Sequence, residues 1–153
     1  MFKKVHDFFS RKSKGEGITD ILGTMMCILA LLFIMCAFIN YVKILELKRN
    51  INGIVRDNIL ILETNGELTL SDVDNIYTEL NRLNISDDKI TLTINEISAN
   101  RTSVPNNKVL FGNEVKLSVE VNMTRREIGL MKVIGTSESY KFVSEKISTS
   151  KKK

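Results

Sequence analysis

The feature that most constrains this chain is a run of 22 consecutive uncharged, largely apolar residues from Ile21 to Val42. A helix of about 20 apolar residues is long enough to cross the hydrocarbon core of a bilayer. The run is longer than the apolar region of about 7–15 residues in a cleaved secretory signal, and no small-x-small cleavage site follows it. The sequence therefore predicts a retained signal anchor, so membrane lipid is the first partner we expect.

The rest of the 153-residue chain is long enough for one small domain. Of its residues, 111 follow Val42, which suffices for one modest hydrophobic core. Lys and Arg number five in residues 1–17 and four in residues 43–57, and the short leader is the easier side to keep in the cytoplasm. We therefore expect a single-pass protein of the cell membrane, with a cytoplasmic N-terminus and an extracytoplasmic domain.

A helical pattern continues beyond the apolar run. Apolar residues recur there at steps of three and four, which places them on one face of a helix: Ile44, Leu47, Ile51, Ile54, Val55, Ile59 and Leu62. The sequence predicts one helix from about Ile18 to Thr64, with an apolar stripe on its second half. Gly53 weakens this helix and is expected to mark a bend, and Asn65-Gly66 is expected to end it.

A second, shorter amphipathic helix is predicted next. Ser71 is its expected N-cap, with Asp74 in the reciprocal position of a capping box. Its apolar face comprises Val73, Ile76, Tyr77, Leu80 and Leu83. Asn84 to Asp88 are expected to end the helix.

The period then changes from 3.6 to 2, which indicates strands. Alternation predicts one strand at 90–95 and a longer one at 115–123, separated by a surface loop from Ser98 to Lys108. Further strands are expected at Val109–Phe111, at Ile128–Ile134 and, as a strand or short helix, at Tyr140–Ile147. The tail from Ser148 is expected to be too polar to pack.

The predicted fold class is α+β: a long N-terminal transmembrane and amphipathic helix, a second helix, and a three- to four-stranded antiparallel sheet whose apolar face the helices cover. The expected organisation is a basic leader or cytoplasmic segment at 1–15, the helix at 16–64, the extracytoplasmic domain at 65–147 and a basic tail at 148–153.

Few residues in this sequence have the pattern of a catalytic or ligand-binding site. The single histidine, His6, lies in the leader, and no phosphate loop or metal-ligand spacing occurs. Cys27 and Cys36 fall on opposite sides of the apolar helix, which favours a packing role over a redox role. We expect no enzyme activity, cofactor, metal or small-molecule substrate. The basic residues cluster at the two chain ends without a nucleic-acid-binding pattern, so no nucleic acid is expected as a partner.

The junction before the apolar run has a more specific pattern. Lys14 and Gly15 end the basic leader, Glu16 follows, and Asp20 lies immediately before the run. A carboxylate next to hydrocarbon is costly unless a cation pairs with it. These residues resemble the type IV pilin superfamily, and most closely the TadE-like minor pilins or pseudopilins of tight-adherence pili. The order of a helix followed by a sheet is similar too.

The resemblance implies a processed subunit. A prepilin-type peptidase would cut after Gly15, which makes Glu16 the first mature residue and Asp20 the fifth. In this family the fifth residue is an acid that pairs with the free amino terminus of a neighbouring subunit. The implied partners are that peptidase and copies of the chain or other pilin-like subunits, in a pilus or secretion apparatus. Gly17 offers a competing cut that would place Asp20 third.

A simpler interpretation of the same residues stays open. An acidic residue such as Asp20 is also common in the first turn of a helix, because its carboxylate interacts favourably with the helix dipole and stabilises the helix by about 0.3–1 kcal/mol. On that interpretation Gly15 and Gly17 are linker residues and the leader is never removed. The protein would then be an unprocessed, signal-anchored binding or accessory protein of a secretion or conjugation complex.

Overall fold

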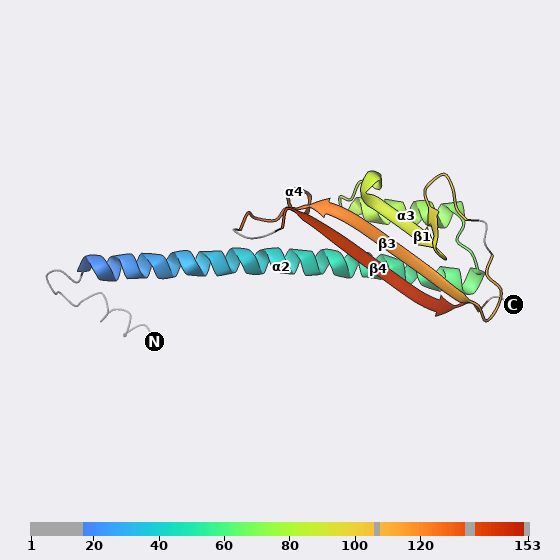
Figure 1. The fold of residues 1–153 in the computed structure, drawn as a ribbon, viewed down its shortest axis with the longest axis horizontal. Helices are drawn as coiled ribbons and strands as arrows, with labels where there is room; N and C mark the ends of the chain where they lie inside the picture. Colours follow the sequence, from blue (N-terminus) through green and yellow to red (C-terminus); the bar gives the residue numbers. More distant parts are fainter. Residues whose placement is uncertain (1–16, 106–107, 134–136, 152–153) are drawn as a thin grey trace. The chain divides into compact units, whose positions relative to one another are not determined.

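The structure is a computed structural model, which describes residues 17–105, 108–133 and 137–151, with side chains from Asp20 onward. The chain divides into two compact units, Met1–Ile39 and Asn40–Lys153. A single helix, α2 (Gly17–Asn65), begins in the first unit and ends in the second (Figure 1). Gly53 does not interrupt this helix, and the space around its Cα is open.

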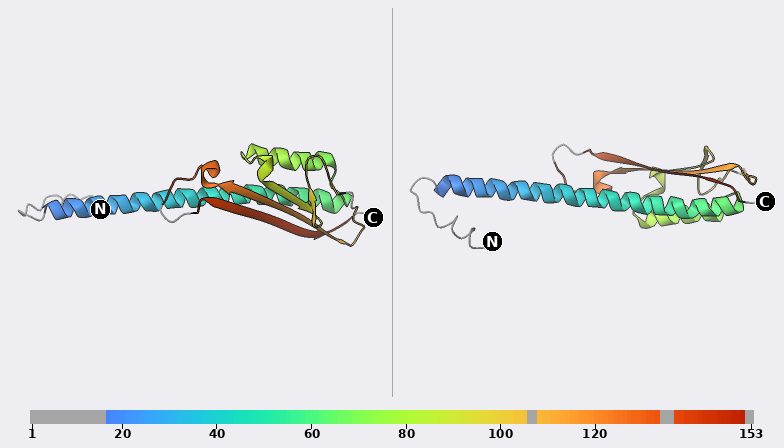
Figure 2. Two further views of the ribbon diagram at one scale, coloured as in Figure 1. Left: turned by 45° about the horizontal axis from the view of Figure 1, so that its top comes forward. Right: turned by 90° about the horizontal axis from the view of Figure 1, so that it is seen from below.

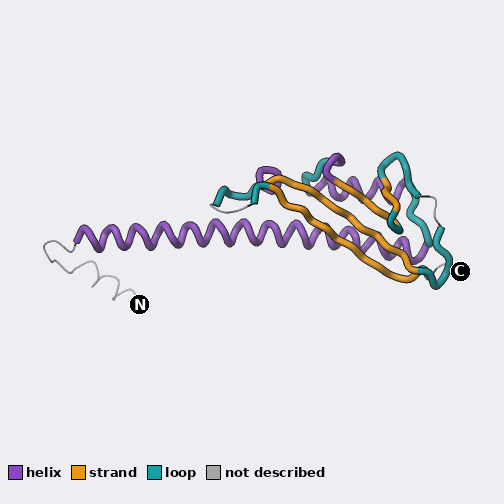
Figure 3. Tube along the Cα trace, viewed as in Figure 1, coloured by secondary structure: helices purple, strands orange, loops and turns teal. Residues whose placement is uncertain are grey.

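The second unit is an α+β domain, as the sequence predicts. Its other elements are α3 (Leu70–Arg82), a 3-10 turn η1 (Asp87–Lys89), β1 (Ile90–Ile94), β2 (Ile97–Ala99), β3 (Glu114–Thr124), α4 (Arg125–Ile128) and β4 (Ser139–Thr149). The four strands form one antiparallel sheet in the order β2-β1-β3-β4. Figure 3 separates these helices, strands and loops by colour.

One face of the sheet is covered by α3 and by residues 40–65 of α2, as the turned views show (Figure 2). The stripe predicted on α2 supplies five buried residues to this core: Leu47, Ile51, Val55, Ile59 and Leu62. Strand β3 contributes five buried residues to the same core, and they alternate along the strand with more exposed polar residues: Val115, Leu117, Val119, Val121 and Met123. Apolar burial of this kind is the main stabilising contribution to a small domain.

Helix α3 begins two residues earlier than the sequence suggested, so the prediction of Ser71 as its cap is wrong. Thr69 is the cap: its hydroxyl accepts from the Asp72 amide at 3.3 Å, and the Asp72 carboxylate accepts from the Thr69 amide at 2.8 Å. Leu68 and Val73 are both buried, and they occupy the positions of a hydrophobic staple around this cap. The staple explains why the chain uses the first of two overlapping capping registers.

The predicted strand at Ile128–Ile134 is also wrong within the described residues. Thr124 and Glu127 form a capping box that starts α4, and Gly129 closes this short helix at φ +68°. Leu130 then turns back, because its amide donates to the Arg125 carbonyl at 3.0 Å. Local capping therefore overrides the weak alternation in this stretch.

One loop prediction and one further strand prediction also differ from the structure. The expected loop from Ser98 begins inside β2, which pairs with β1 through a two-residue turn at Asn95 and Glu96, both at positive φ. Val109–Phe111 forms no strand. Its first residue instead donates its amide to the Gly66 carbonyl at 2.8 Å.

The prediction that the tail from Ser148 does not pack is wrong. Strand β4 continues through Thr149, which pairs with Glu114 at the start of β3. Ser150 is 1% exposed, and its amide donates to the Asn113 carbonyl at 2.8 Å. Lys151 donates its amide to the Glu63 carbonyl at 2.7 Å and its ammonium to the Glu63 carboxylate at 2.8 Å. The polar tail is therefore held by backbone pairing and charge.

Candidate functional site: an uncovered apolar helix

The first half of α2 presents apolar side chains that nothing in the described chain covers. Ile34 and Phe38 are each 65% exposed, and the most apolar 18-residue stretch of this helix contains no buried residue. Within the described residues, α2 is the one helix long and apolar enough to cross a membrane. This property fits a single-pass membrane anchor.

The length of the free segment is close to one bilayer. The first unit ends at Ile39, so the uncharged run contributes 19 residues, Ile21–Ile39, outside the domain. At 1.5 Å per residue this helix is about 28 Å long, and the hydrocarbon core is about 30 Å thick. The last three residues of the run belong instead to the second unit.

Asn40 and Lys43 bind the loop that follows α4. The Asn40 side chain is 6% exposed; its Nδ2 donates to the Met131 carbonyl at 2.8 Å, and the Met131 amide donates to its Oδ1 at 2.8 Å. The Lys43 ammonium donates to the Gly129 carbonyl at 2.7 Å. These contacts mark the residue at which α2 enters its domain, and the sequence pattern alone did not single out Asn40.

Asp20 lies in the first turn of α2 with an exposed side chain. Its backbone carbonyl accepts a hydrogen bond from the Thr24 hydroxyl at 2.7 Å. Among the described side chains, those of residues 20–105, 108–133 and 137–151, no cation forms an ion pair with the Asp20 carboxylate. The other predicted site residues, Lys14, Gly15 and Glu16, lie outside the described part of the chain. Cys27 and Cys36, both free thiols, lie in the exposed apolar segment.

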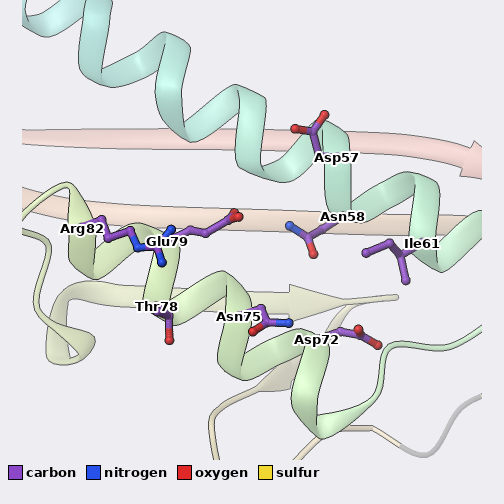
Figure 4. Close-up of a pocket in the computed structure, with 8 residues that line it drawn as sticks. All are labelled: Asp57, Asn58, Ile61, Asp72, Asn75, Thr78, Glu79 and Arg82. Atoms are coloured by element: carbon purple, nitrogen blue, oxygen red, sulfur yellow. The ribbon is translucent and has the colours of Figure 1, made fainter.

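Polar grooves flank α2 in the second unit. Figure 4 shows the groove between α2 and α3, which Asp57, Asp72, Glu79 and Arg82 line together with neutral residues. A second groove, between α2 and β4, is lined by Lys48, Arg49, Arg56 and Lys146. Across the described residues, no three His, Cys, Asp or Glu side chains are grouped as a metal site requires.

Two ion pairs at the ends of the domain shift carboxyl pKa values. The pKa of Glu127 is lowered to about 2, mainly by a hydrogen bond from the Lys89 ammonium. Hydrogen bonds from the amide and hydroxyl of Thr124 lower it further. Hydrogen bonding from Lys151, aided by Ser148, lowers the pKa of Glu63. Both pairs join segments distant in sequence, so we interpret them as ties that hold the fold.

A third cluster lies over α3. Arg101 contacts Asp74 at 3.5 Å and Asp87 at 3.2 Å, and its guanidinium lies 5.6 Å from the centroid of the Tyr77 ring. Burial, followed by the Asp87 charge, raises the pKa of the Tyr77 phenol. Its hydroxyl donates to the Ala99 carbonyl at 3.4 Å. The cluster therefore fastens the loop after β2 to α3.

The geometry defines an α+β domain on a helix suited to single-pass membrane anchoring. No protein-family model matches the chain, and neither a curated protein nor a solved structure matches it.

Proposed function

We propose that this protein is a non-enzymatic, single-pass membrane subunit that assembles through its N-terminal helix, in the manner of a pilin or TadE-like pseudopilin. The observation that carries the proposal is the uncovered apolar surface of residues 21–39. Burying apolar surface is worth about 25 cal/mol per Å², so this surface requires lipid or another helix around it. In the membrane it contacts lipid, and in an assembly it contacts other subunits.

In this proposal a prepilin-type peptidase removes residues 1–15, and the new amino terminus at Glu16 supplies a cation. The Asp20 carboxylate of a neighbouring subunit binds that cation. An ionised acid at the edge of the hydrocarbon is expensive unless it is paired, so the pair favours association of neighbouring helices. The exposure of Asp20, and its lack of a cation among the described side chains, support this role.

The domain supplies contacts to neighbouring subunits or partners. The proposed topology keeps the leader in the cytoplasm and places the domain outside the membrane, with the domain on the cell surface after assembly. The shared core supports a structural role, because five buried residues of α2 belong to one hydrophobic cluster with residues of β3 and α3.

The test is processing. The chain is co-expressed with a prepilin peptidase, and the N-terminal residue is determined by mass spectrometry. We expect a mature chain that begins at Glu16, and we expect Gly15→Leu to block its formation. Gly17→Leu is the matched control, since it removes the competing glycine and should leave the cut in place. An intact N-terminus in the presence of an active peptidase would instead favour the unprocessed anchor.

The second test separates assembly from capping by Asp20. Two differently tagged copies are co-expressed, and their co-purification is measured in mild detergent. Asp20→Ala should leave processing intact and reduce co-purification, whereas Asp20→Glu should retain it because the charge is kept. If Asp20→Ala reduces neither processing nor co-purification, the carboxylate only complements the helix dipole, which is worth about 0.3–1 kcal/mol.

A further inference from the structure

The groove between α2 and β4 is cationic. Lys48, Arg49 and Arg56 line it from α2 and Lys146 from β4, around a volume of about 590 Å³. No carboxylate is among the residues that line this groove in the described structure. Four like charges that face one groove repel one another, so the groove favours an occupant with negative charge.

These cations have little compensation within the domain. Arg56 contacts Asp57 at 3.3 Å, but both side chains are largely exposed. Among the described residues, Lys48, Arg49 and Lys146 form no ion pair. Lys146 occupies the core face of the sheet, opposite Leu117 of β3. An inward-facing lysine protects an edge strand from pairing, but that role does not account for the three α2 cations beside it.

The opposite flank of α2 is anionic. Asp57, Asp72 and Glu79 line the groove between α2 and α3, against the single cation Arg82 (Figure 4). Around the helix axis, Asp57 lies about 180° from Lys48 but about 100° from Arg56, with which it forms an ion pair. The two grooves therefore carry opposite charge on two different flanks of one helix.

We propose that these two flanks bind each other between copies of this chain: the cationic groove of one subunit contacts the anionic groove of the next. This inference rests on the proposed function, because it assumes assembly with the α2 helices side by side. When neighbouring copies are related by rotation about an axis parallel to α2, one flank of α2 in each copy faces the other flank of α2 in the next copy. Repeating such a heterologous contact gives a closed ring only if the successive rotations add up to a full turn. Otherwise the copies form an open helical filament.

Charge complementarity selects a second copy over a lipid headgroup. Phosphate would satisfy the cationic groove, but it would leave the carboxylates across α2 unexplained. A second copy uses both surfaces at once, and like-charged flanks would repel any copy that arrived in the inverted orientation. Complementary charge of this kind fixes register and speeds association more than it adds affinity.

The first test is a disulfide between flanks of separate copies. Full-length chains carry Cys27→Ala and Cys36→Ala; one tagged copy also carries Lys48→Cys and the other Glu79→Cys. We expect a mixed disulfide when membranes of the expressing cells are treated with a copper-based thiol oxidant, which accepts the two electrons released as the two thiols lose their protons and join. The matched control pairs Glu79→Cys with Lys141→Cys, an exposed β4 lysine that does not line the groove, and should give at least about tenfold less product.

The second test reverses charge. Lys48→Glu with Arg49→Glu places like charges across the proposed contact and should lower the disulfide yield between Arg56→Cys and Glu79→Cys copies about tenfold. Adding Asp57→Lys to the Glu79→Cys copy should restore most of that yield. All these side chains are exposed, so the changes leave the core intact. The yield should also fall as salt rises, because screening shortens the range of the attraction.

The outcomes separate this inference from the proposed function. Co-purification of the two tagged copies without a mixed disulfide would overturn the flank contact and leave helix-mediated assembly standing. Loss of both co-purification and disulfide would overturn both. A disulfide suppressed in phosphatidylglycerol vesicles, relative to neutral phosphatidylcholine vesicles, would assign the groove to lipid phosphate instead. Equal yield in the two vesicles, with charge-swap rescue, would support the second copy.

Discussion

Asn40 gives the sharpest test of where the free helix ends. Its side chain is 6% exposed and exchanges two hydrogen bonds with the Met131 backbone, both at 2.8 Å. Asn40→Ala removes both bonds. Each such bond contributes about 0.5–1.5 kcal/mol net, so the pair contributes about 1–3 kcal/mol. Because Met131 is 44% exposed, water can replace part of the loss, and we expect a cost of about 1–2 kcal/mol.

The assay is amide hydrogen exchange at Met131 in the full chain, held in detergent micelles. A cost of about 1–2 kcal/mol raises the population of the open loop about 5- to 30-fold, and the exchange rate of the Met131 amide should rise by the same factor. Amides in the centre of β3 should change much less, because the Asn40 contact lies outside the sheet.

Two comparison variants make the result interpretable. Asn50→Ala makes the same chemical change at an exposed position of α2 and should leave Met131 exchange unaltered. Asn40→Asp keeps an acceptor for the Met131 amide but loses the donor to the Met131 carbonyl. Its Met131 exchange rate should therefore lie between those of Asn40→Ala and Asn50→Ala. If Asn40→Ala and Asn50→Ala behave alike, the Asn40 side chain is not held by the domain, and the reasoning that ends the free helix at Ile39 is refuted.

Three further predictions test the core of the domain and its two carboxyl ion pairs. Ile51→Ala, at a side chain 1% exposed, should lower the free energy of unfolding by about 2–5 kcal/mol in denaturant titration, against less than about 0.5 kcal/mol for Leu60→Ala at 52% exposure. The Glu127 carboxyl should titrate at about 2 by NMR, so its stabilisation is complete above its ordinary pKa of 4.5 and is lost as pH falls toward 2. Glu127→Gln should remove that part of the pH dependence, and a folded pKa near 4.5 would contradict the ion pair. Lys151→Ala should raise the pKa of Glu63; an unchanged titration would mean that the tail is not held there.

The elements that the sequence predicts well are those with a strong local period. The stripe from Leu47 to Leu62 follows the 3.6-residue repeat of a helix. Five of its residues are buried in the structure, and Ile54 is partly buried. The alternation at 115–123 predicts a half-buried strand, and β3 spans Glu114–Thr124 with alternating burial. Side-chain polarity and backbone geometry are enough here, because each pattern fits only one regular element.

Elsewhere the local pattern leaves a choice that the tertiary structure makes. Thr69 and Ser71 both begin a plausible capping box, and the buried Leu68 beside Val73 selects the first. The polar stretch after Ile147 continues as a strand because β3 offers it unpaired backbone groups as far as Glu114. The partner of the tail, which begins at Glu114, is too far away in sequence to be inferred from local composition or period.

The N-terminal helix shows the same division within one element. The sequence alone determined that an uncharged run begins after Asp20 and is long enough to cross a membrane, because length and the absence of charge are local properties. The tertiary structure decided that the run stops being free at Asn40. An asparagine has no charge that would break the apolar pattern, and the backbone that binds its side chain lies 91 residues away, at Met131.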